Sequence, residues 1–231
     1  TVIGGIFSGV QGTARTNIAR LNQNGALDTG FMNNLAGTDA AVRALLIQPD
    51  SKILVGGEFT TVNGVTRKGV ARLNLDGSLD PTFQTNVAGV NGVVSCLALQ
   101  PDLKVLIGGS FSSGNNTSAT HLARLNSDGT LDLTFSPGSI SVGSVGIRSL
   151  AVKLDGRVLV GGSISQIGSV ALNNIARLSA TGAVETFMAT GTDLPVYALS
   201  LLDDTRMLVG GGFSTINDVA QVREMARQAG A

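Results

Sequence analysis

A pair of adjacent glycines recurs five times along the 231 residues, at steps of 52, 52, 53 and 49 residues. Each pair ends an apolar run such as "KILVGG" at 52–57, and an Ala-Arg-Leu motif follows the first four pairs. The pairs are Gly4-Gly5, Gly56-Gly57, Gly108-Gly109, Gly161-Gly162 and Gly210-Gly211. A unit of about 50 residues whose motifs recur in a fixed order constrains the fold strongly, because each unit must bury its apolar face against its neighbours.

Each unit contains four short runs that predict β-strands. In the second unit they are 42–48 (VRALLIQ), 52–59 (KILVGGEF), 70–74 (VARLN) and 79–83 (LDPTF), which we name segments A, B, C and D. Runs of four to eight residues bounded by Gly, Pro, Asp and Asn are typical of strands. Units of 40–50 residues with four strands indicate propeller blades. The sequence therefore predicts an all-β fold, a β-propeller of four-stranded antiparallel blades.

The repeats predict a single domain over 1–231 with about five blades, of which the terminal ones are incomplete. The repeats span about 1–31, 32–83, 84–135, 136–187 and 188–231. The first lacks segment A and the fifth lacks segment D, so three arrangements remain open: a fragment of a longer propeller, five blades with two thin ones, or four blades with spare segments. Residues 219–231 also have high helix propensity, so the sequence leaves open whether they form a short helix or segment C of the fifth repeat.

The "ILVGG" strand resembles the kelch repeat, and the full unit is similar to the bacterial delta-sixty repeat. The resemblance covers essentially the whole chain, because four landmarks recur in order. It departs from kelch proteins by lacking their tryptophan, near whose place Phe83 stands. The resemblance implies a bacterial protein that is secreted or on the cell surface, where such repeats serve binding or adhesion.

Glycines after a strand also suggest a phosphate cradle, but that site needs a following helix and a Gly-Lys-Ser/Thr ending, and neither is present. Glycine inside a strand is tolerated where another backbone approaches closely. We therefore interpret the pairs as points of close contact between neighbouring blades.

The hairpin between segments C and D predicts an ion pair in each complete repeat. A three-residue loop, 75–77, places Gly77 at the left-handed position. Arg72 then faces Asp80, and directly opposed charges stabilise a sheet by roughly 0.2–1 kcal/mol. The same register pairs Arg20 with Asp28, Arg124 with Asp132, and Arg177 with Glu185. We interpret these residues as structural rather than catalytic.

Composition removes several classes of function. Lysine plus arginine equals aspartate plus glutamate at 16 each, so the chain has no electrostatic footprint for nucleic acid. No apolar stretch approaches the ~20 residues that span a bilayer, and no charged-then-apolar leader opens the chain, so we expect a signal peptide to be absent or removed.

One histidine and one cysteine cannot build a zinc site, and no cofactor is expected. The "NLDGSLD" loops resemble calcium loops, but Asn24 and Thr181 replace the aspartate, which favours simple turns.

The loops that differ between repeats are the expected docking face for a protein or glycan. The A–B and C–D turns keep their chemistry, whereas the B–C and D–A loops vary, and the latter two emerge on one rim of an up-and-down blade. Function on rigid scaffolds concentrates in loops. Candidate contact residues are Asp39, Asn63, Arg67, Asn115, Asn116, His121 and Asp193.

The sequence predicts a non-enzymatic binding or structural module. One alternative is a lectin-like propeller, which the scarcity of aromatic platforms disfavours, with no Trp and one Tyr. A second is a hydrolase or lyase that uses the loop carboxylates Asp39 and Asp193. A third is an architectural segment of a longer adhesin. Serines and aspartates are common, but nothing marks a triad around His121.

Overall fold

The structure is a computed structural model that describes all residues except 85–88, 115–118, 187, 204, 218 and 221–231. The segment 219–231 lies almost wholly outside the described residues. The described part of the chain consists of strands and turns without a helix. Internal contacts divide the chain into two compact units, Thr1–Leu133 and Thr134–Ala231, and each is described separately.

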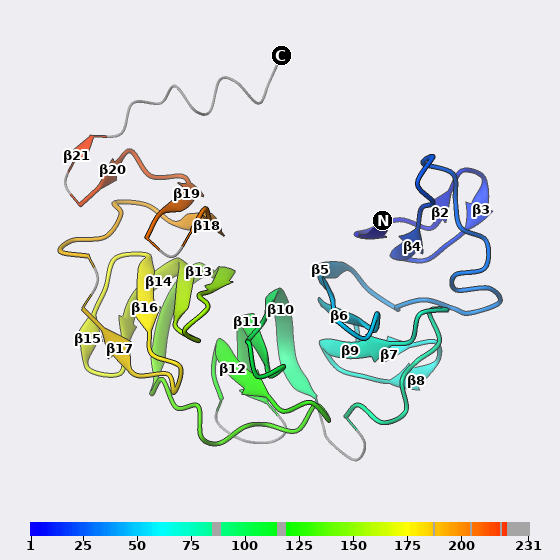
Figure 1. The fold of residues 1–231 in the computed structure, drawn as a ribbon, viewed down its shortest axis with the longest axis horizontal. Helices are drawn as coiled ribbons and strands as arrows, with labels where there is room; N and C mark the ends of the chain where they lie inside the picture. The colour runs from blue at the N-terminus through cyan, green and yellow to red at the C-terminus, as the bar shows by residue number, and fades with distance from the viewer. Residues whose placement is uncertain (85–88, 115–118, 187, 204, 218, 221–231) are drawn as a thin grey trace. The chain divides into compact units, whose positions relative to one another are not determined.

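The first unit holds one antiparallel sheet for each of the first three repeats (Figure 1). The sheets are β1 (Val2–Gly4) with β4 (Ile18–Arg20), then β5 (Val42–Ile47), β6 (Ile53–Gly57) and β9 (Val70–Leu73), then β10 (Val90–Leu99), β11 (Val105–Gly114) and β12 (Leu122–Leu125). Two small hairpins fill the B–C loops, β2 (Gly9–Val10) with β3 (Thr13–Ala14) and β7 (Thr61–Val62) with β8 (Val65–Thr66). The order A-B-C within each sheet is the predicted one.

The second unit holds the sheets of the fourth and fifth repeats. The fourth sheet runs β13 (Ile140–Val152), β14 (Val158–Ile167), β16 (Ile175–Leu178) and β17 (Val184–Glu185), and β15 (Val170–Ala171) also pairs with β14. The fifth sheet pairs β18 (Val196–Leu201) with β19 (Met207–Gly211), and a hairpin of β20 (Thr215–Ile216) and β21 (Val219–Ala220) follows.

Segment D is shorter than predicted. In the second repeat it is a single bridge between Leu73 and Leu79, and only the fourth repeat forms a true strand there, β17. The cause is the acid of the ion pair: Asp80 Oδ1 accepts the N–H of Thr82 at 2.9 Å, a local turn that bends the chain away from the sheet. Glu185 is one methylene longer than aspartate, and the chain there remains in register with Arg177 as part of β17.

In three of the pairs the first glycine lies beneath segment A of the next sheet in the same unit. A Cβ on Gly56 would stand 2.7 Å from Cγ1 of Val94, and one on Gly161 would stand 2.7 Å from Cγ1 of Val196. A Cβ on Gly4 would collide with Val42 in the same way. Within each unit, therefore, a β-branched side chain of one sheet fits into a hollow that glycine leaves in the preceding sheet, as predicted.

The second glycine has a different role, and its assignment to contact between blades is wrong. A Cβ there would collide with a backbone carbonyl of segment A in the same sheet: Ala41 for Gly57, Val93 for Gly109, Pro195 for Gly211. The pairing of A with B shifts register at this place, as between Val42 and Ala44. The second glycine thus accommodates a β-bulge that its own sheet contains.

The core lies between successive sheets. In the first unit, Ile18 and Phe31 of the first repeat pack with Met32, Ile53 and Phe59 of the second. Leu54, Val70 and Phe83 of the second repeat pack in the same way against the third sheet. Leu54 is 0% exposed where the third sheet packs on it.

The C–D turns of the second, third and fourth repeats also bind the residue that directly follows the preceding segment D. The N–H groups of Met32, Gln84 and Ser136 donate to the turn carbonyls of Asp76 (2.9 Å), Asp128 (2.7 Å) and Thr181 (3.0 Å). Gly77 has φ of 89°, as the predicted turn requires, and a Cβ there would stand 2.9 Å from the backbone nitrogen of Met32. The turn glycine thus supplies both the left-handed conformation and room for the neighbouring repeat.

We predict that Gly56→Ala lowers the midpoint of chemical denaturation while Gly210→Ala does not. The added methyl at 56 meets Val94, a stiff side chain in a packed core, and overpacking of this kind costs about 1–3 kcal/mol. At Gly210 the nearest atom is Cβ of Ala198 at 3.8 Å, an ordinary contact, so the methyl is accommodated. Equal destabilisation by both substitutions contradicts the assignment.

Candidate functional site

The four predicted ion pairs are all present, each joining Nε of the arginine to one carboxylate oxygen. The distances are 2.8 Å for Arg20–Asp28, 2.7 Å for Arg72–Asp80, 2.7 Å for Arg124–Asp132 and 2.9 Å for Arg177–Glu185. Arg72 also donates from Nη1 to the carbonyl of Ser127 at 2.7 Å, in the turn of the next repeat. Its guanidinium carbon lies 4.7 Å from the centroid of the Phe83 ring. Arg72 therefore connects its own hairpin to the turn of the next repeat.

A second cation completes the network and was not predicted. Lys52 contacts Asp80 at 2.8 Å, Lys104 contacts Asp132 at 2.7 Å, and Arg157 contacts Glu185 at 2.9 Å. Each of these residues ends the A–B turn, 28 residues before its partner. The recurrence of Lys or Arg at that turn position was the available signal.

The environment of Asp80 stabilises its charged form. Burial alone would raise the pKa of Asp80, but hydrogen bonds from Lys52, Thr82 and Arg72 outweigh it and hold the pKa of that carboxyl well below its ordinary value. Asp80 is 2% exposed and so depends on these partners.

The loop carboxylates Asp39 and Asp193 lie in different units, and each holds a loop in place. Asp193 Oδ1 accepts the N–H groups of Ser214 and Thr215 at 2.9 Å, and Oδ2 accepts the Ser214 hydroxyl at 2.6 Å. Asp39 makes the equivalent three bonds to Thr60 and Thr61. Chiefly through the Ser214 hydroxyl, these bonds lower the pKa of Asp193 to about 2.

Asn63 and Arg67 are also held by their own repeat. Asn63 lies in the β7–β8 turn with φ of 51°, its N–H donates to Gly37 at 2.8 Å, and its side chain bonds Gly37 and Gly77. Arg67 Nη1 donates to the carbonyl of Thr66 at 2.8 Å. Asn115 and Asn116 lie outside the described residues.

His121 occupies a backbone position that requires a left-handed residue. Its φ is 64°, and the equivalent residues Asn17, Gly69 and Asn174 have φ of 63°, 71° and 68°. The N–H of His121 donates to Phe111 at 2.9 Å, and its Nδ1 is buried without a partner among the described residues. Asparagine, glycine and histidine share this place because they tolerate the conformation.

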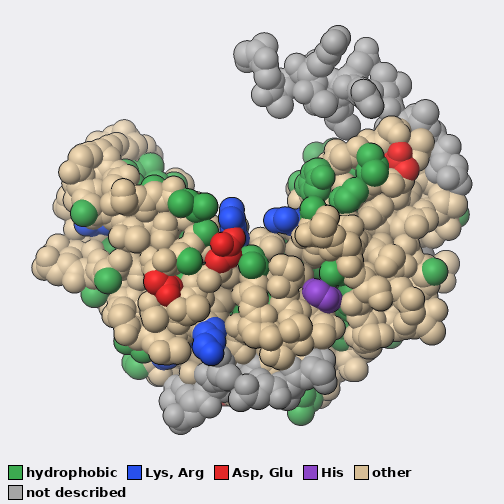
Figure 2. Space-filling model, turned by 180° about the vertical axis from the view of Figure 1, so that it is seen from behind, with side chains coloured by type: hydrophobic (Ala, Val, Ile, Leu, Met, Phe, Trp, Pro, Cys, Tyr) green, Lys and Arg blue, Asp and Glu red, His purple; other side chains and the backbone are tan. Residues whose placement is uncertain are grey.

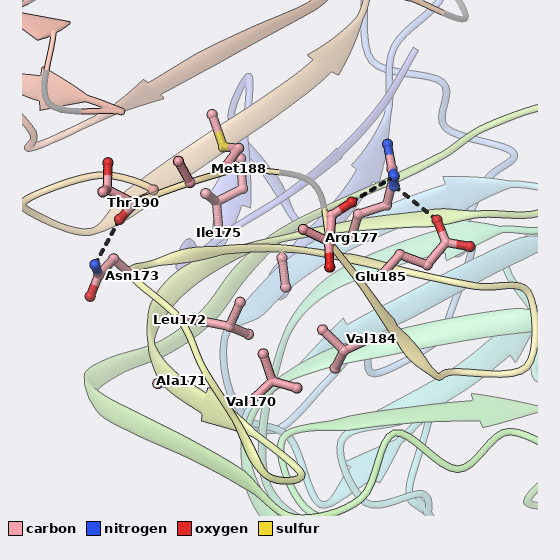
Figure 3. A pocket seen from close by; sticks show the side chains of 14 residues that line it. Val170, Ala171, Leu172, Asn173, Ile175, Arg177, Val184, Glu185, Met188 and Thr190 are labelled. Carbon is pink, nitrogen blue, oxygen red and sulfur yellow. Dashed lines mark hydrogen bonds and ion pairs between the residues drawn. The ribbon is translucent and has the colours of Figure 1, made fainter.

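The described part of the second unit contains a pocket of about 160 Å³ that the sequence did not predict. Its walls are the B–C loop at 170–173 and the D–A loop at 188–191, and its floor is formed by β16 and β17. We call it the loop pocket. In Figure 3 the Arg177–Glu185 pair and the Asn173–Thr190 hydrogen bond lie at opposite ends, with Ile175, Leu172 and Val184 between them.

A second hollow shares lining residues with the loop pocket. Residues 173–174, 190–193 and Thr215 line a second hollow of about 270 Å³. Thr190 has its carbonyl bonded by Asn173 at 2.7 Å, but its hydroxyl oxygen is buried without a partner among the described residues. Both hollows therefore lie among B–C and D–A loops.

The described residues hold no group of three or more His, Cys, Asp or Glu side chains that fits a metal ion. Among those same residues, no helix is long and apolar enough to cross a membrane. Figure 2 shows scattered charged side chains on the face drawn, and the Lys and Arg side chains there do not form a continuous stripe.

Repeated antiparallel sheets that pack face to face through glycine hollows define the β-propeller class of repeat protein. A family model confirms this class: residues 1–31, 48–83, 100–135 and 154–187 match the model described as a domain of unknown function, DUF5122, β-propeller. The chain belongs to the DUF5122 β-propeller family. The matched segments contain the Gly-Gly pairs and ion-pair hairpins of the first four repeats.

One solved structure supports the fold, and the fold alone. A gluconolactonase from Xanthomonas campestris is 15% identical with a TM-score of 0.53, and the match covers 84% of this chain and 62% of that one. The virginiamycin B lyase of Staphylococcus aureus is 14% identical with a TM-score of 0.36, covering 78% and 66%. No curated protein sequence matches the chain.

We predict that Asp80→Asn lowers the free energy of unfolding at pH 7 by about 3 kcal/mol, because it leaves Arg72 buried without its counter-charge. The contribution of Asp80 is present above its unfolded pKa, about 3.9. It is lost as the pH falls towards the depressed folded value. Unfolding measured from pH 7 to pH 2 should therefore show a flatter profile for the variant. Asp28→Asn, at a half-buried pair, is the control with a smaller effect. A variant profile parallel to wild type contradicts the account.

We predict that His121→Gly leaves the thermal midpoint unchanged or raised, whereas His121→Val lowers it. Glycine adopts φ of 64° without strain, and a β-branched residue there costs roughly 1–2 kcal/mol or more. Differential scanning calorimetry distinguishes the two. A destabilised glycine variant would show that the imidazole itself makes an essential contact.

Proposed function

We propose that the chain is a non-enzymatic binding or structural module whose partner, a protein or glycan, docks on the B–C and D–A loops. The carrying observation is the loop pocket, which both loop types line. These loops are also joined: Thr38 bridges Val62 in one unit and Thr192 bridges Ile216 in the other. A rigid frame that presents variable loops together supports a binding role.

The loop carboxylates favour this proposal over a hydrolase or lyase. A general acid or base works best with a pKa near the operating pH, whereas the pKa of Asp193 is lowered to about 2. Asp39 and Asp193 each accept three hydrogen bonds from their own repeat, which supports a role in loop structure.

Location and repeat type belong to the same proposal. We infer that the units are delta-sixty, kelch-like repeats and that the protein acts outside the cell or on its surface. The support is the order of landmarks in the sequence: the apolar strand with its glycine pair, the Ala-Arg-Leu motif, the turn and the acid-phenylalanine motif.

The test combines glycan and peptide arrays with two grafted variants. In the first, residues 165–173 are replaced by residues 60–68, the equivalent hairpin of the second repeat. The control is Ser127→Leu, which places the residue of the second C–D turn in the third. We expect the affinity of any array ligand to fall at least tenfold in the graft and to stay unchanged in the control.

Three outcomes contradict the proposal. Equal binding by the graft removes the loop assignment. Binding to nothing on either array removes the binding function and leaves an architectural role. Hydrolysis of an ester or lactone panel that Asp39→Asn or Asp193→Asn abolishes would establish an enzyme instead.

A further inference from the structure

A β-bulge interrupts segment A at the same place in the second, third, fourth and fifth repeats. One residue at each bulge is left without a partner in segment B, because the pairing skips it. These bulge residues are Arg43, Ser95, Arg148 and Tyr197. A bulge turns a side chain out of the regular ladder, which makes such a residue available for other contacts.

In the second repeat, segment B neutralises the bulge residue. Arg43 donates from Nε to Oε1 of Glu58 at 2.8 Å, and its Nη2 lies 2.6 Å from the same oxygen. Glu58 is the residue that directly follows the glycine pair. The third repeat has two uncharged residues, Ser95 and Ser110, at these places. Neither repeat therefore has a bulge charge without a counter-charge.

The fourth repeat keeps the arginine and lacks the acid. Arg148 is the bulge residue, and Ser163 follows the glycine pair where the second repeat has Glu58. Arg148 is exposed, and it makes no hydrogen bond or ion pair within the part of the chain that the structure describes. A guanidinium presents several donors in a planar fork that matches a carboxylate. The carboxylate of a ligand would supply the counter-charge that this repeat lacks.

The fifth repeat has the only tyrosine of the chain at its bulge. The side chain of Tyr197 lies over Gly212, because a Cβ built on that glycine would stand 3.5 Å from the hydroxyl oxygen and 3.7 Å from Cε2. The same Cβ would stand 3.9 Å from Cβ of Leu194, in the D–A loop. Tyr197 and Leu194 are each 51% exposed. Glycine thus lets the ring lie against its own sheet while half of the side chain stays open to solvent.

Arg148 and Tyr197 lie on neighbouring strands of the second unit. Strands β13 and β18 are side by side (Figure 1), and the N–H of Leu199 donates to Oγ of Ser149 at 2.9 Å. Ser149 directly follows Arg148, and Tyr197 is two residues before Leu199, about 7 Å along an extended strand. Arg43 and Tyr197 both lie over the residue after the glycine pair, so the equivalent position directs Arg148 towards the same edge.

We propose that Arg148 and Tyr197 bind an acidic sugar residue of a glycan, with its carboxylate on the guanidinium and its ring on the tyrosine. Charge favours an anion, because Arg148 has no acid at the place of Glu58. The tyrosine favours a sugar over an acidic peptide, because an open aromatic surface packs against the C–H face of a pyranose ring, and an Asp or Glu side chain has no such face.

The site lies where the D–A loop that contains Asp193 and Leu194 enters β18. The proposal therefore rests on the binding function proposed above and specifies its ligand. Asp193 is occupied by Ser214 and Thr215, so its carboxylate serves the loop.

The test is an NMR titration of the full chain with methyl β-D-glucuronide, methyl β-D-glucoside and N-acetyl-glutamate amide. We expect saturable shifts at 147–149 and 195–199 with the glucuronide. The other two should bind about tenfold more weakly or less, since one lacks the charge and the other lacks the ring. Arg148→Gln should weaken glucuronide binding by a similar factor. Arg43→Gln is the matched control, the bulge arginine that already has its acid, and should bind as wild type does.

Two further variants test each half of the site. Ser163→Glu supplies the acid that the second repeat has, so it should abolish glucuronide binding without lowering the thermal midpoint. Tyr197→Ala should weaken binding several-fold, whereas Tyr197→Phe keeps the ring and should retain it. An unchanged affinity in Tyr197→Ala overturns the assignment of a sugar.

The proposal is overturned if the glucuronide does not bind, if the glucoside binds equally well, or if Arg148→Gln and Arg43→Gln have the same effect. Equal binding of the glutamate derivative would make an acidic peptide the ligand instead. An array ligand whose binding is lost with the loop graft but unaffected by Arg148→Gln leaves the broader function standing and removes only this site.

Discussion

The contact between a glycine of segment B and a β-branched residue of the next segment A determines how the repeats stack. Gly56 leaves a hollow that Val94 fills, and Gly161 does the same for Val196. Dispersion attraction and apolar burial stabilise this contact only when the sheets approach closely. A methyl group on the glycine would prevent that close approach. Leu54, in the strand that carries Gly56, is fully buried by this approach.

Polar groups then fix the register of one repeat on the next. The N–H of Met32 binds the Asp76 carbonyl, and Arg72 reaches the Ser127 carbonyl from a hairpin that also contains Asp80. These bonds join segments about 45 to 55 residues apart, so the same motif can recur along the chain only if the spacing is kept. The nearly constant step between glycine pairs follows from this requirement.

The sequence predicted features that depend on local register and missed those that depend on a distant neighbour. The Arg72–Asp80 pair followed from the turn at Gly77, because a hairpin of known length fixes which residues face each other. Lys52 was missed because it reaches Asp80 from another segment. The role of Gly57 was missed because the carbonyl that it accommodates belongs to a bulge in the paired strand, which no pattern in segment B reveals. The loop pocket was missed because residues 170–173 and 188–191 form it together, and no pattern within either loop shows that the two approach each other.

The most direct measurement of the central claim is a double-mutant cycle between Gly56→Ala and Val94→Ala, followed by equilibrium denaturation. If the two residues form a hollow and its filling group, shortening Val94 makes room for the methyl at 56. The cost of Gly56→Ala should then fall by about 1 kcal/mol or more in the Val94→Ala background, within the range of coupling seen for residues in contact. Additive costs would show that the two residues do not share this space and would contradict the account.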